Sequence, residues 1–140
     1  MRYLLDTCIV LFLINDTGET GNDVDAIVND YGNQLYICAT SVRELVAAWY
    51  KYAKMQTKWK TPSQMLDYVR NQFGIEILYP QREHYQTFVN LHWNLAAKHT
   101  DTTDHLIIAH AITEKLPLIS SDGKFDFYCA QGLDFIYNKR

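Results

Sequence analysis

The feature that most constrains the fold of this chain is a series of short apolar, β-prone runs spaced along it. The first run, residues 2–6, carries Tyr3, Leu4 and Leu5 in succession and does not alternate apolar with polar side chains. Further runs of this kind lie at residues 35–39, 75–79, 116–120 and 133–137. Continuous apolar strands are typical of parallel sheets that are covered by helices on both faces.

The segments between these runs carry apolar residues at helical spacing, as Val42, Leu45 and Trp49 do in residues 41–58. Strands that alternate with helices predict an α/β fold with a mainly parallel sheet of about five strands. Because no linker or repeat interrupts residues 1–140, we expect a single domain. The expected helices begin at about residue 8 and then cover residues 22–31, 41–58, 62–73, 82–98 and 103–115.

Composition narrows the class of protein. Charged residues make up 21% of the chain, and no apolar run approaches the ~20 residues that span a bilayer. The opening run lacks a small-residue cleavage site and is interrupted by Asp6, so it does not have the form of a signal peptide. Cys8, Cys38 and Cys129 have no metal-like spacing and are interpreted as reduced thiols. We therefore expect a cytoplasmic protein without a membrane partner.

Four acidic residues stand at equivalent places relative to the expected strands. Asp6 ends the first strand, and Asp122 follows the fourth. Glu44 lies in the first turn of the helix after the second strand, and Asp104 lies in the first turn of the helix before the fourth. The carboxyl ends of parallel strands meet at one edge of a sheet, where ligands bind. The sequence therefore predicts that these carboxylates gather at that edge.

Each acid also has a purely structural explanation. Ser41 and Glu44 have the spacing of a capping box, and Asp104 suits the positive end of a helix dipole. Asp122 precedes a glycine as in many turns, and Asp6 could cap the next helix. Caps, however, scatter over both ends of a sheet, whereas these four acids are expected at one end. Their common location favours a functional cluster.

Clustered carboxylates point to divalent metal. Several carboxylates close together repel one another and raise their pKa values. A hard cation such as Mg²⁺ or Mn²⁺ removes that penalty and prefers oxygen ligands. Such ions polarise a phosphoryl oxygen and generate a hydroxide nucleophile, which indicates hydrolysis of phosphodiester bonds. A bound cation also answers the objection that a net charge of −3 is unfavourable for a nucleic-acid protein.

Four motifs follow one another along the chain: LLDT at 4–7, SVREL at 41–45, HTDTTDHLIIAHA at 99–111 and LISSDGKF at 118–125. Together they resemble the PIN-domain family, and most closely the VapC-type toxins of bacterial toxin–antitoxin systems. The resemblance implies a three-layer α/β/α sandwich and a Mg²⁺- or Mn²⁺-dependent endoribonuclease. It also implies an antitoxin partner, a homodimer, and RNA products with a 5′-phosphate and a 3′-hydroxyl.

The resemblance assigns roles to the residues that match the family's motifs. Asp6, Asp104 and Asp122 match metal-binding acids. Glu44 matches the second family acid and either joins the ligands or orients the attacking water as a general base. Thr7 and Ser121 match the two hydroxyl positions, with Ser120 as the alternative to Ser121. Both hydroxyls are expected to hold carboxylates in place by hydrogen bonds.

Two departures from the family pattern affect the site. Cys8 stands where many members have asparagine, and a thiol is a poor ligand for Mg²⁺. The segment from Asp101 to His105 lacks the proline and arginine that often surround the third acid. Asp101 is therefore a lesser candidate ligand.

Cationic residues near the acids are candidates for contact with RNA. Arg43 and Lys124 lie close in sequence to the acids, and Lys51 stands between Tyr50 and Tyr52. Lysines interleaved with aromatic rings suit a nucleic-acid strand, because phosphates meet the cations and bases stack on the rings. Later lysines in this segment are interpreted as a solvated helix end: Lys54, Lys58 and Lys60.

The histidines and one tryptophan are assigned structural roles or left open. A site built of hard oxygen ligands gains little from imidazole, so we do not expect His99, His105 or His110 to bind the metal. His105 and His110 also lack the i, i+4 spacing of a shared helical face. Trp49 either belongs to the core or lines an apolar groove for an antitoxin segment or a second subunit.

Three alternatives compete with a nuclease. A phosphatase of the haloacid-dehalogenase type has Asp-x-Asp near its first strand, but Cys8 occupies the second place here. A receiver domain has an aspartate after its third strand, which residues 76–80 do not supply. A PIN-like scaffold that only binds RNA or protein is the third alternative, and the presence of all four acids argues against it.

Overall fold

The computed structural model describes residues 1–140, whose five strands form one parallel sheet. The strands follow the order β3-β2-β1-β4-β5, and all four neighbouring pairs are parallel. The prediction of a parallel sheet of about five strands is therefore confirmed. The strands are β1 (Arg2–Leu5), β2 (Gln34–Cys38), β3 (Ile75–Leu78), β4 (Leu118–Ser120) and β5 (Phe135–Tyr137).

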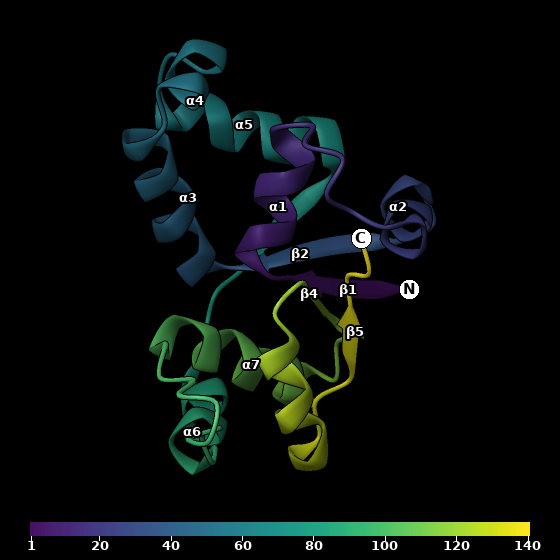
Figure 1. The fold of residues 1–140 in the computed structure, drawn as a ribbon, viewed down its shortest axis with the longest axis vertical. Coiled ribbons are helices and arrows are strands. Elements are labelled where there is room, and N and C mark those ends of the chain that lie inside the picture. Colours follow the sequence, from purple (N-terminus) through teal and green to yellow (C-terminus); the bar gives the residue numbers. More distant parts are fainter.

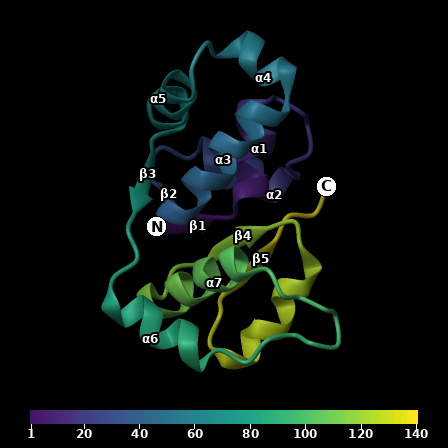
Figure 2. The ribbon, with the colours of Figure 1, turned by 90° about the vertical axis from the view of Figure 1, so that its left-hand side faces the viewer.

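Helices cover both faces of this sheet and make the expected three-layer sandwich. Figures 1 and 2 show α1, α3, α4 and α5 on one side of the sheet and α6 and α7 on the other. No helix combines the length and the apolar character needed to cross a membrane. The helices are α1 (Thr7–Ile14), α2 (Asn22–Asn29), α3 (Ala39–Lys51), α4 (Ala53–Lys58), α5 (Pro62–Phe73), α6 (Arg82–Asn90), α7 (Thr102–Glu114) and the 3₁₀ helix η1 (Gly123–Gln131).

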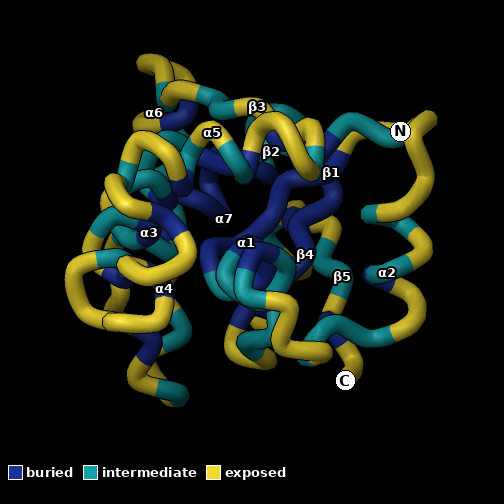
Figure 3. The backbone as a smooth tube through the Cα atoms, turned by 90° about the horizontal axis from the view of Figure 1, so that it is seen from above, coloured by how far each residue is buried: buried dark blue, intermediate teal, exposed yellow.

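The central strand supplies both cores, because successive side chains of a strand point to opposite faces. Tyr3 and Leu5 belong to the core on the side of α1, α3 and α5. Leu4 belongs to the core on the side of α7 and η1. Leu4 and Leu5 are fully buried, and Figure 3 shows β1 and β4 as dark, enclosed strands. Burial of each such side chain stabilises the fold by roughly 1.5–3 kcal/mol.

Helix α5 begins and ends where the sequence predicts. Thr61 caps its start by accepting a hydrogen bond from the backbone N–H of Gln64 at 3.1 Å. Pro62 follows as the first helical residue, where its missing N–H costs nothing. Gly74 ends the helix with φ +64°, a left-handed conformation that glycine adopts without steric cost.

The helix expected at residues 41–58 is two helices, and it starts earlier. Helix α3 begins at Ala39, so Ser41 lies inside the first turn and the predicted capping box is wrong. The chain leaves helical geometry at Tyr52, which has φ −113° and ψ 113°. The side-chain amide of Gln56 then donates to the carbonyls of Trp49 and Tyr50 at 3.0 and 3.1 Å. These bonds satisfy carbonyls that a continuous helix would have paired internally.

Two other segments differ from expectation because distant contacts override local helical spacing. The helix expected at residues 82–98 ends at Asn90, and residues 91–99 run back toward α7 without regular structure. This segment is tied to η1, since Gln131 exchanges two side-chain hydrogen bonds with the backbone of His92, both at 2.9 Å. Residues 123–131, which were not expected to be helical, form η1 itself.

Candidate metal centre

The first acid, Asp6, is held at the carboxyl end of the central strand by three donors. It caps α1 by accepting from the backbone N–H of Thr7 at 2.8 Å. Its other oxygen, Oδ2, accepts from the hydroxyl of Ser120 at 2.7 Å and lies 3.5 Å from the Cys8 thiol. The side chain is 6% exposed. Asp6 is therefore both a helix cap and a fixed carboxylate at the sheet edge.

Ser120 joins the first and fourth acids across neighbouring strands. While its hydroxyl donates to Asp6, it accepts from the backbone N–H of Asp122 at 3.0 Å. Asp122 in turn caps η1 by accepting from the backbone N–H of Lys124 at 3.0 Å. Ser121, the hydroxyl that was expected to hold a carboxylate, accepts from the side-chain amide of Asn138 at 2.8 Å. The alternative, Ser120, occupies that role.

Thr7 fixes the second acid, Glu44, from across the cleft between α1 and α3. Its hydroxyl oxygen lies 2.6 Å from Glu44 Oε1 and 2.9 Å from Ser41 Oγ. A threonine hydroxyl carries one proton, so donation to the Glu44 carboxylate leaves Ser41 to donate to Thr7. Ser41, which the sequence suggested as a cap, thus supports the residue that orients Glu44.

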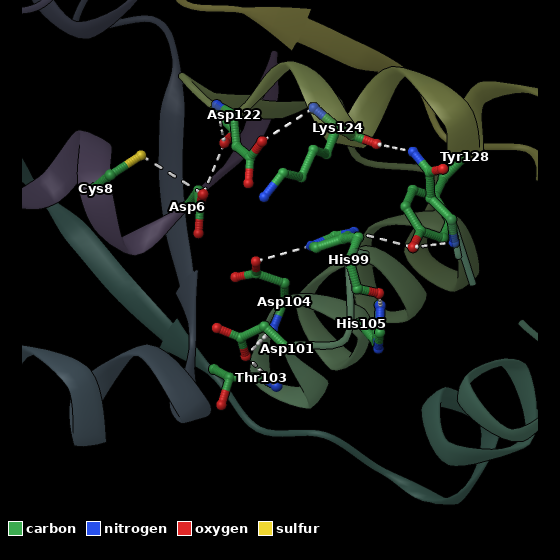
Figure 4. Close-up of polar contacts among 12 residues, drawn as sticks. Asp6, Cys8, His99, Asp101, Thr103, Asp104, His105, Asp122, Lys124 and Tyr128 are labelled. Atoms are coloured by element: carbon green, nitrogen blue, oxygen red, sulfur yellow. Dashed lines mark hydrogen bonds and ion pairs between the residues drawn. The ribbon is translucent and has the colours of Figure 1, made fainter. Parts of the chain in front are cut away.

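The third acid, Asp104, lies in the first turn of α7, as expected. The helix is capped by Asp101, which accepts from the backbone N–H groups of Thr103 at 2.9 Å and Asp104 at 3.3 Å. Asp104 Oδ2 lies 3.0 Å from Nε2 of His99, a side chain only 3% exposed (Figure 4). Ligand atoms of His99, Asp104 and Asp122 all lie within 4.8 Å of one another. His99 is thus a neighbour of the acids that sequence reasoning set aside.

Negative charge dominates the electrostatics of the cluster. Burial, followed by the negative charges of Asp6, Asp101, Glu44 and Asp122 in that order, raises the pKa of Asp104 to about 8. Burial also raises the pKa of Asp6, against the hydrogen bonds from Ser120 and Thr7 that lower it. Burial likewise raises the pKa of Glu44, although the hydrogen bond from Thr7 partly offsets this effect. Like charges are therefore concentrated here beyond what the surrounding donors neutralise.

The three cationic candidates lie at the margin of the cluster, and all are exposed. Lys51 lines a cavity of about 400 Å³ together with Asp6, Glu44 and Asp104. The Lys124 side chain points toward the acids in Figure 4. Arg43, on α3, lowers the pKa of Glu44 through its charge, which is the smallest of the influences on that pKa.

Lys58, in contrast, has a structural role. Its ammonium group lies 4.8 and 5.2 Å from the ring centres of Trp59 and Tyr68 and donates to the carbonyl of Ile14. Trp49 is half-buried against the core, and its indole N–H donates to the carbonyl of Trp59 at 2.8 Å. The segment after Tyr52 is therefore organised by packing against α5.

The other two histidines named in the sequence analysis do not contact the carboxylates. His105 is buried and its Nε2 lies 3.0 Å from the carbonyl of His99. His110 is also buried, with Nδ1 3.2 Å from the sulfur of Cys38. Burial lowers the pKa of both, in the case of His110 to about 4, so both rings are neutral near pH 7.

A second group of potential ligands, formed by His84, His110 and Glu114, is satisfied without an ion. The backbone N–H of Gln81 donates to His84 Nδ1 at 2.7 Å, so the ring proton lies on Nε2. Nε2 then donates to Glu114 Oε1 at 2.7 Å. A metal bound to Nε2 would displace that proton. The neutral ring would then carry its proton on Nδ1, where two donors, this N–H and the backbone N–H of Gln81, would face each other. The group therefore caps α6 and fastens it to α7.

The donor set at the sheet edge fits a hard divalent cation. Its members are carboxylate oxygens, which Mg²⁺ and Mn²⁺ prefer. Burial raises the pKa values of Asp6, Glu44 and Asp104, and the negative charges of neighbouring carboxylates, which such an ion would neutralise, add to each shift. Asp6, Asp104 and Asp122 are the residues that could hold it, with Glu44 beside them.

The fold and the site together define the class of this protein. It is a parallel α/β sandwich with an acidic cluster at the carboxyl edge of its sheet. The family model described as PIN domain matches residues 3–130, nearly the whole chain. The chain therefore belongs to the PIN-domain family, and the resemblance seen in its motifs is confirmed.

Solved structures share this fold at low sequence identity. VapBC2 from Rickettsia felis, bound to a promoter DNA fragment, gives a TM-score of 0.73 at 22% identity over 99% of this chain and 100% of that chain. DNA-bound VapBC from Salmonella typhimurium gives 0.70 at 18% identity, covering 99% of both chains. VapBC-5 from Mycobacterium tuberculosis gives 0.65 at 16% identity, covering 99% and 98%. Comparison with curated protein sequences gives no match.

Proposed function

We propose that this protein is a Mg²⁺- or Mn²⁺-dependent endoribonuclease and the toxin of a toxin–antitoxin pair. The observation that carries the proposal is the convergence of Asp6, Glu44, Asp104 and Asp122 at one edge of the sheet, where burial and the neighbouring negative charges together raise the pKa of Asp104 to about 8. Membership of the PIN-domain family supports the activity. The likeness to VapBC-5, which is described as a member of a family of toxin–antitoxin systems, supports the biological role.

Three carboxylates would hold the ion: Asp6, Asp104 and Asp122. When bound, Mg²⁺ or Mn²⁺ stabilises negative charge on the phosphoryl oxygens and lowers the pKa of water. The protein's contribution is to fix the ligands before binding. Ser120 and the Thr7 amide hold Asp6, and the cap of η1 holds Asp122.

Glu44 is the proposed general base. Its Oε1 is held by Thr7 at 2.6 Å, and its pKa is raised by burial, which makes it a better proton acceptor than an exposed glutamate. It takes a proton from the water that attacks the phosphorus in line. The 3′ oxygen leaves and takes up a proton from solvent, so the products carry a 5′-phosphate and a 3′-hydroxyl.

Cations at the margin of the site are proposed to bind the RNA backbone. Lys51 lies on the wall of the cavity that Asp6 and Glu44 share, and Tyr52 on the same wall offers a ring for base stacking. Arg43 and Lys124 are the other proposed phosphate contacts. Their charges offset the acidic cluster for an approaching polyanion.

The proposed partners and location follow the same line. An antitoxin that covers the acidic edge would keep the enzyme inactive, and a homodimer is the proposed state of the free protein. Both are consistent with the toxin–antitoxin complexes whose chains share this fold. The proposed location is the cytoplasm, where RNA and reduced thiols are found.

The test is cleavage of end-labelled RNA by the purified protein. We expect cleavage with Mg²⁺ or Mn²⁺, none with chelator, and none by Asp6→Asn or Asp104→Asn. Asp67→Asn, an exposed carboxylate on α5, is the matched control and should cleave like the wild type. Expression in a bacterial host should arrest growth, and Asp6→Asn should relieve the arrest.

Three outcomes would refute the proposal in different ways. Equal cleavage by wild type and by both site variants would dismiss the assigned site. Release of phosphate from a small monoester without RNA cleavage would indicate a phosphatase. RNA binding without cleavage under any metal would indicate a scaffold that only binds.

A further inference from the structure

His99 is a buried residue next to the acidic cluster for which the proposed reaction has no use so far. It is 3% exposed, and both ring nitrogens have a partner: Nε2 lies 3.0 Å from Asp104 Oδ2, and Nδ1 lies 3.0 Å from the hydroxyl of Tyr128 (Figure 4). His99 is the last residue of the irregular segment 91–99. Its location raises the question of what the ring does for Asp104.

The hydrogen bonds of Tyr128 favour one placement of the proton on His99. The backbone N–H of Asn94 donates to the Tyr128 hydroxyl oxygen at 3.0 Å. The hydroxyl's own proton is then free to go to His99 Nδ1, the acceptor 3.0 Å away. A neutral imidazole that accepts at Nδ1 carries its proton on Nε2. That proton points at Asp104.

The ring is also fixed in orientation. The backbone N–H of His99 donates to the carbonyl of Asn94 at 3.0 Å, and the backbone carbonyl oxygen of His99 lies 3.0 Å from His105 Nε2. The rings of Phe125 and Tyr128 lie 5.4 and 5.5 Å from it, centre to centre. The preceding residue, Lys98, has φ +55°, a left-handed conformation that costs a non-glycine residue about 1–2 kcal/mol. Packing thus overrides a local strain in order to place His99 here.

We propose that His99 is a positioning residue for metal binding: it donates its Nε2 proton to Asp104 Oδ2 and is itself oriented by Tyr128. One oxygen of Asp104 is held, and the other is left to meet the ion. Because Nε2 carries a proton, His99 lies outside the coordination sphere. This inference rests on the proposed metal-dependent function.

The first test measures Mn²⁺ affinity of the full-length protein by calorimetry, without RNA. His99→Leu removes the donor and keeps a bulky side chain, and we expect it to weaken Mn²⁺ binding about 10- to 100-fold, as for other residues that hold a metal ligand. His99→Gln keeps an N–H donor at the position of Nε2 and should recover most of the affinity. A purely structural role would not distinguish Leu from Gln in this way after both are shown to be folded by circular dichroism.

The second test locates the ring proton of His99 directly. In long-range ¹H–¹⁵N spectra of the histidine rings, His99 should carry its proton on Nε2 both without metal and with saturating Mg²⁺. Tyr128→Phe removes the hydroxyl and should allow the other tautomer, with weaker Mn²⁺ binding. A proton on Nδ1 in the wild type, or a Mg²⁺-induced shift of Nε2 to the value of a metal ligand, would overturn the proposal.

The outcomes separate this inference from the nuclease proposal. If the wild type binds Mn²⁺ with the expected dependence on His99 but never cleaves RNA, the nuclease proposal fails and the positioning role stands. If RNA is cleaved and His99→Leu binds Mn²⁺ like the wild type, the positioning role fails alone. If the wild type binds no Mn²⁺, both fail.

Discussion

The two ends of helix α7 each pair a buried histidine with a carboxylate, but the pairs are set in different surroundings. At the first turn His99 lies 3.0 Å from Asp104, and at the last turn His84 lies 2.7 Å from Glu114. Around Asp104, burial and the charges of Asp6, Asp101, Glu44 and Asp122 raise the pKa to about 8. A histidine–carboxylate pair therefore does not by itself mark a functional site.

The two ends of α7 differ in whether the hydrogen bonds and charges of the histidine–carboxylate pair are balanced by their surroundings. At the last turn the backbone N–H of Gln81 and the Glu114 carboxylate use both nitrogens of His84, and the His110 ring lies 4.0 Å away, centre to centre. That group fastens α6 to α7. At the first turn the acids outnumber the cations that reach them, and the excess is a reason to bind an ion.

The sharpest way to break this comparison is to neutralise one carboxylate at each end. Asp104→Asn should weaken Mn²⁺ binding at least about 100-fold, since it removes a ligand and not merely a residue that holds one. Glu114→Gln should change the affinity less than about twofold, because it lies outside the proposed site. Calorimetric titration measures both. Equal losses would mean that the two ends are not distinct.

Removing the histidine at the last turn should lower the stability of the fold and leave Mn²⁺ binding unchanged. His84→Ala leaves the Gln81 N–H without its partner and opens a cavity, so the free energy of unfolding should fall by about 2–3 kcal/mol. Mn²⁺ affinity should stay unchanged. Urea denaturation measures the stability, with Tyr85→Ala, an exposed neighbour, as the control. A tenfold loss of Mn²⁺ affinity would instead make His84 part of a metal site.

Above about pH 6.5, the pH dependence of stability should report mainly the first turn. The pKa of Asp104 is about 8 in the fold and ordinarily near 3.9, so between these values the native state holds a proton that the unfolded chain has released. Stability of the metal-free protein therefore falls as pH rises through this range. The buried histidines, whose pKa values are lowered, oppose this trend below about pH 6.5.

We therefore expect the net fall between about pH 6.5 and 8, with a size of up to about 2 kcal/mol. Denaturation with chelator present measures it. Asp104→Asn should flatten the profile, whereas Glu114→Gln should follow the wild type. A stability that rises with pH in this window would contradict the raised pKa.

The smallest expected effect separates capping from charge at the first turn. Asp101 caps α7, and asparagine caps helices as well as aspartate does, so Asp101→Asn should change stability by less than about 0.5 kcal/mol. It removes one of the charges that raise the pKa of Asp104. The fall of stability with pH should therefore occur at a lower pH in this variant. A loss of Mn²⁺ affinity above tenfold would instead indicate that Asp101 is a ligand.

The fold was predictable where local sequence and tertiary environment agree. Strand β1 is buried on both faces, so its continuous apolar residues predict a strand inside the sheet. Helix α5 has a proline at its start and a glycine at its end, which predict its bounds. The helix expected at residues 82–98 failed because contacts with η1 and Tyr128 hold residues 91–99 in another conformation. Apolar spacing does not encode such distant partners.

The acids of the site were predictable from topology, but the residues that hold them were less so. Asp6 and Asp122 follow neighbouring parallel strands, whose ends must meet. Ser120 and Ser121 are adjacent in sequence, and only the direction in which each side chain leaves β4 decides which one reaches Asp6. His99 lies on an irregular segment, and the one available signal was its position five residues before Asp104.

The order of the strands has a consequence for the cell that makes this protein. Asp6 is synthesised well before its bridging serine, which lies 114 residues further along the chain, and Asp122 follows that serine. The strand that carries Asp6 waits for β4 to pair with it on one side. A growing chain therefore has no complete acidic pocket until Ser120 and Asp122 have been added, and an enzyme proposed to cut RNA would be harmless to the message that encodes it until then.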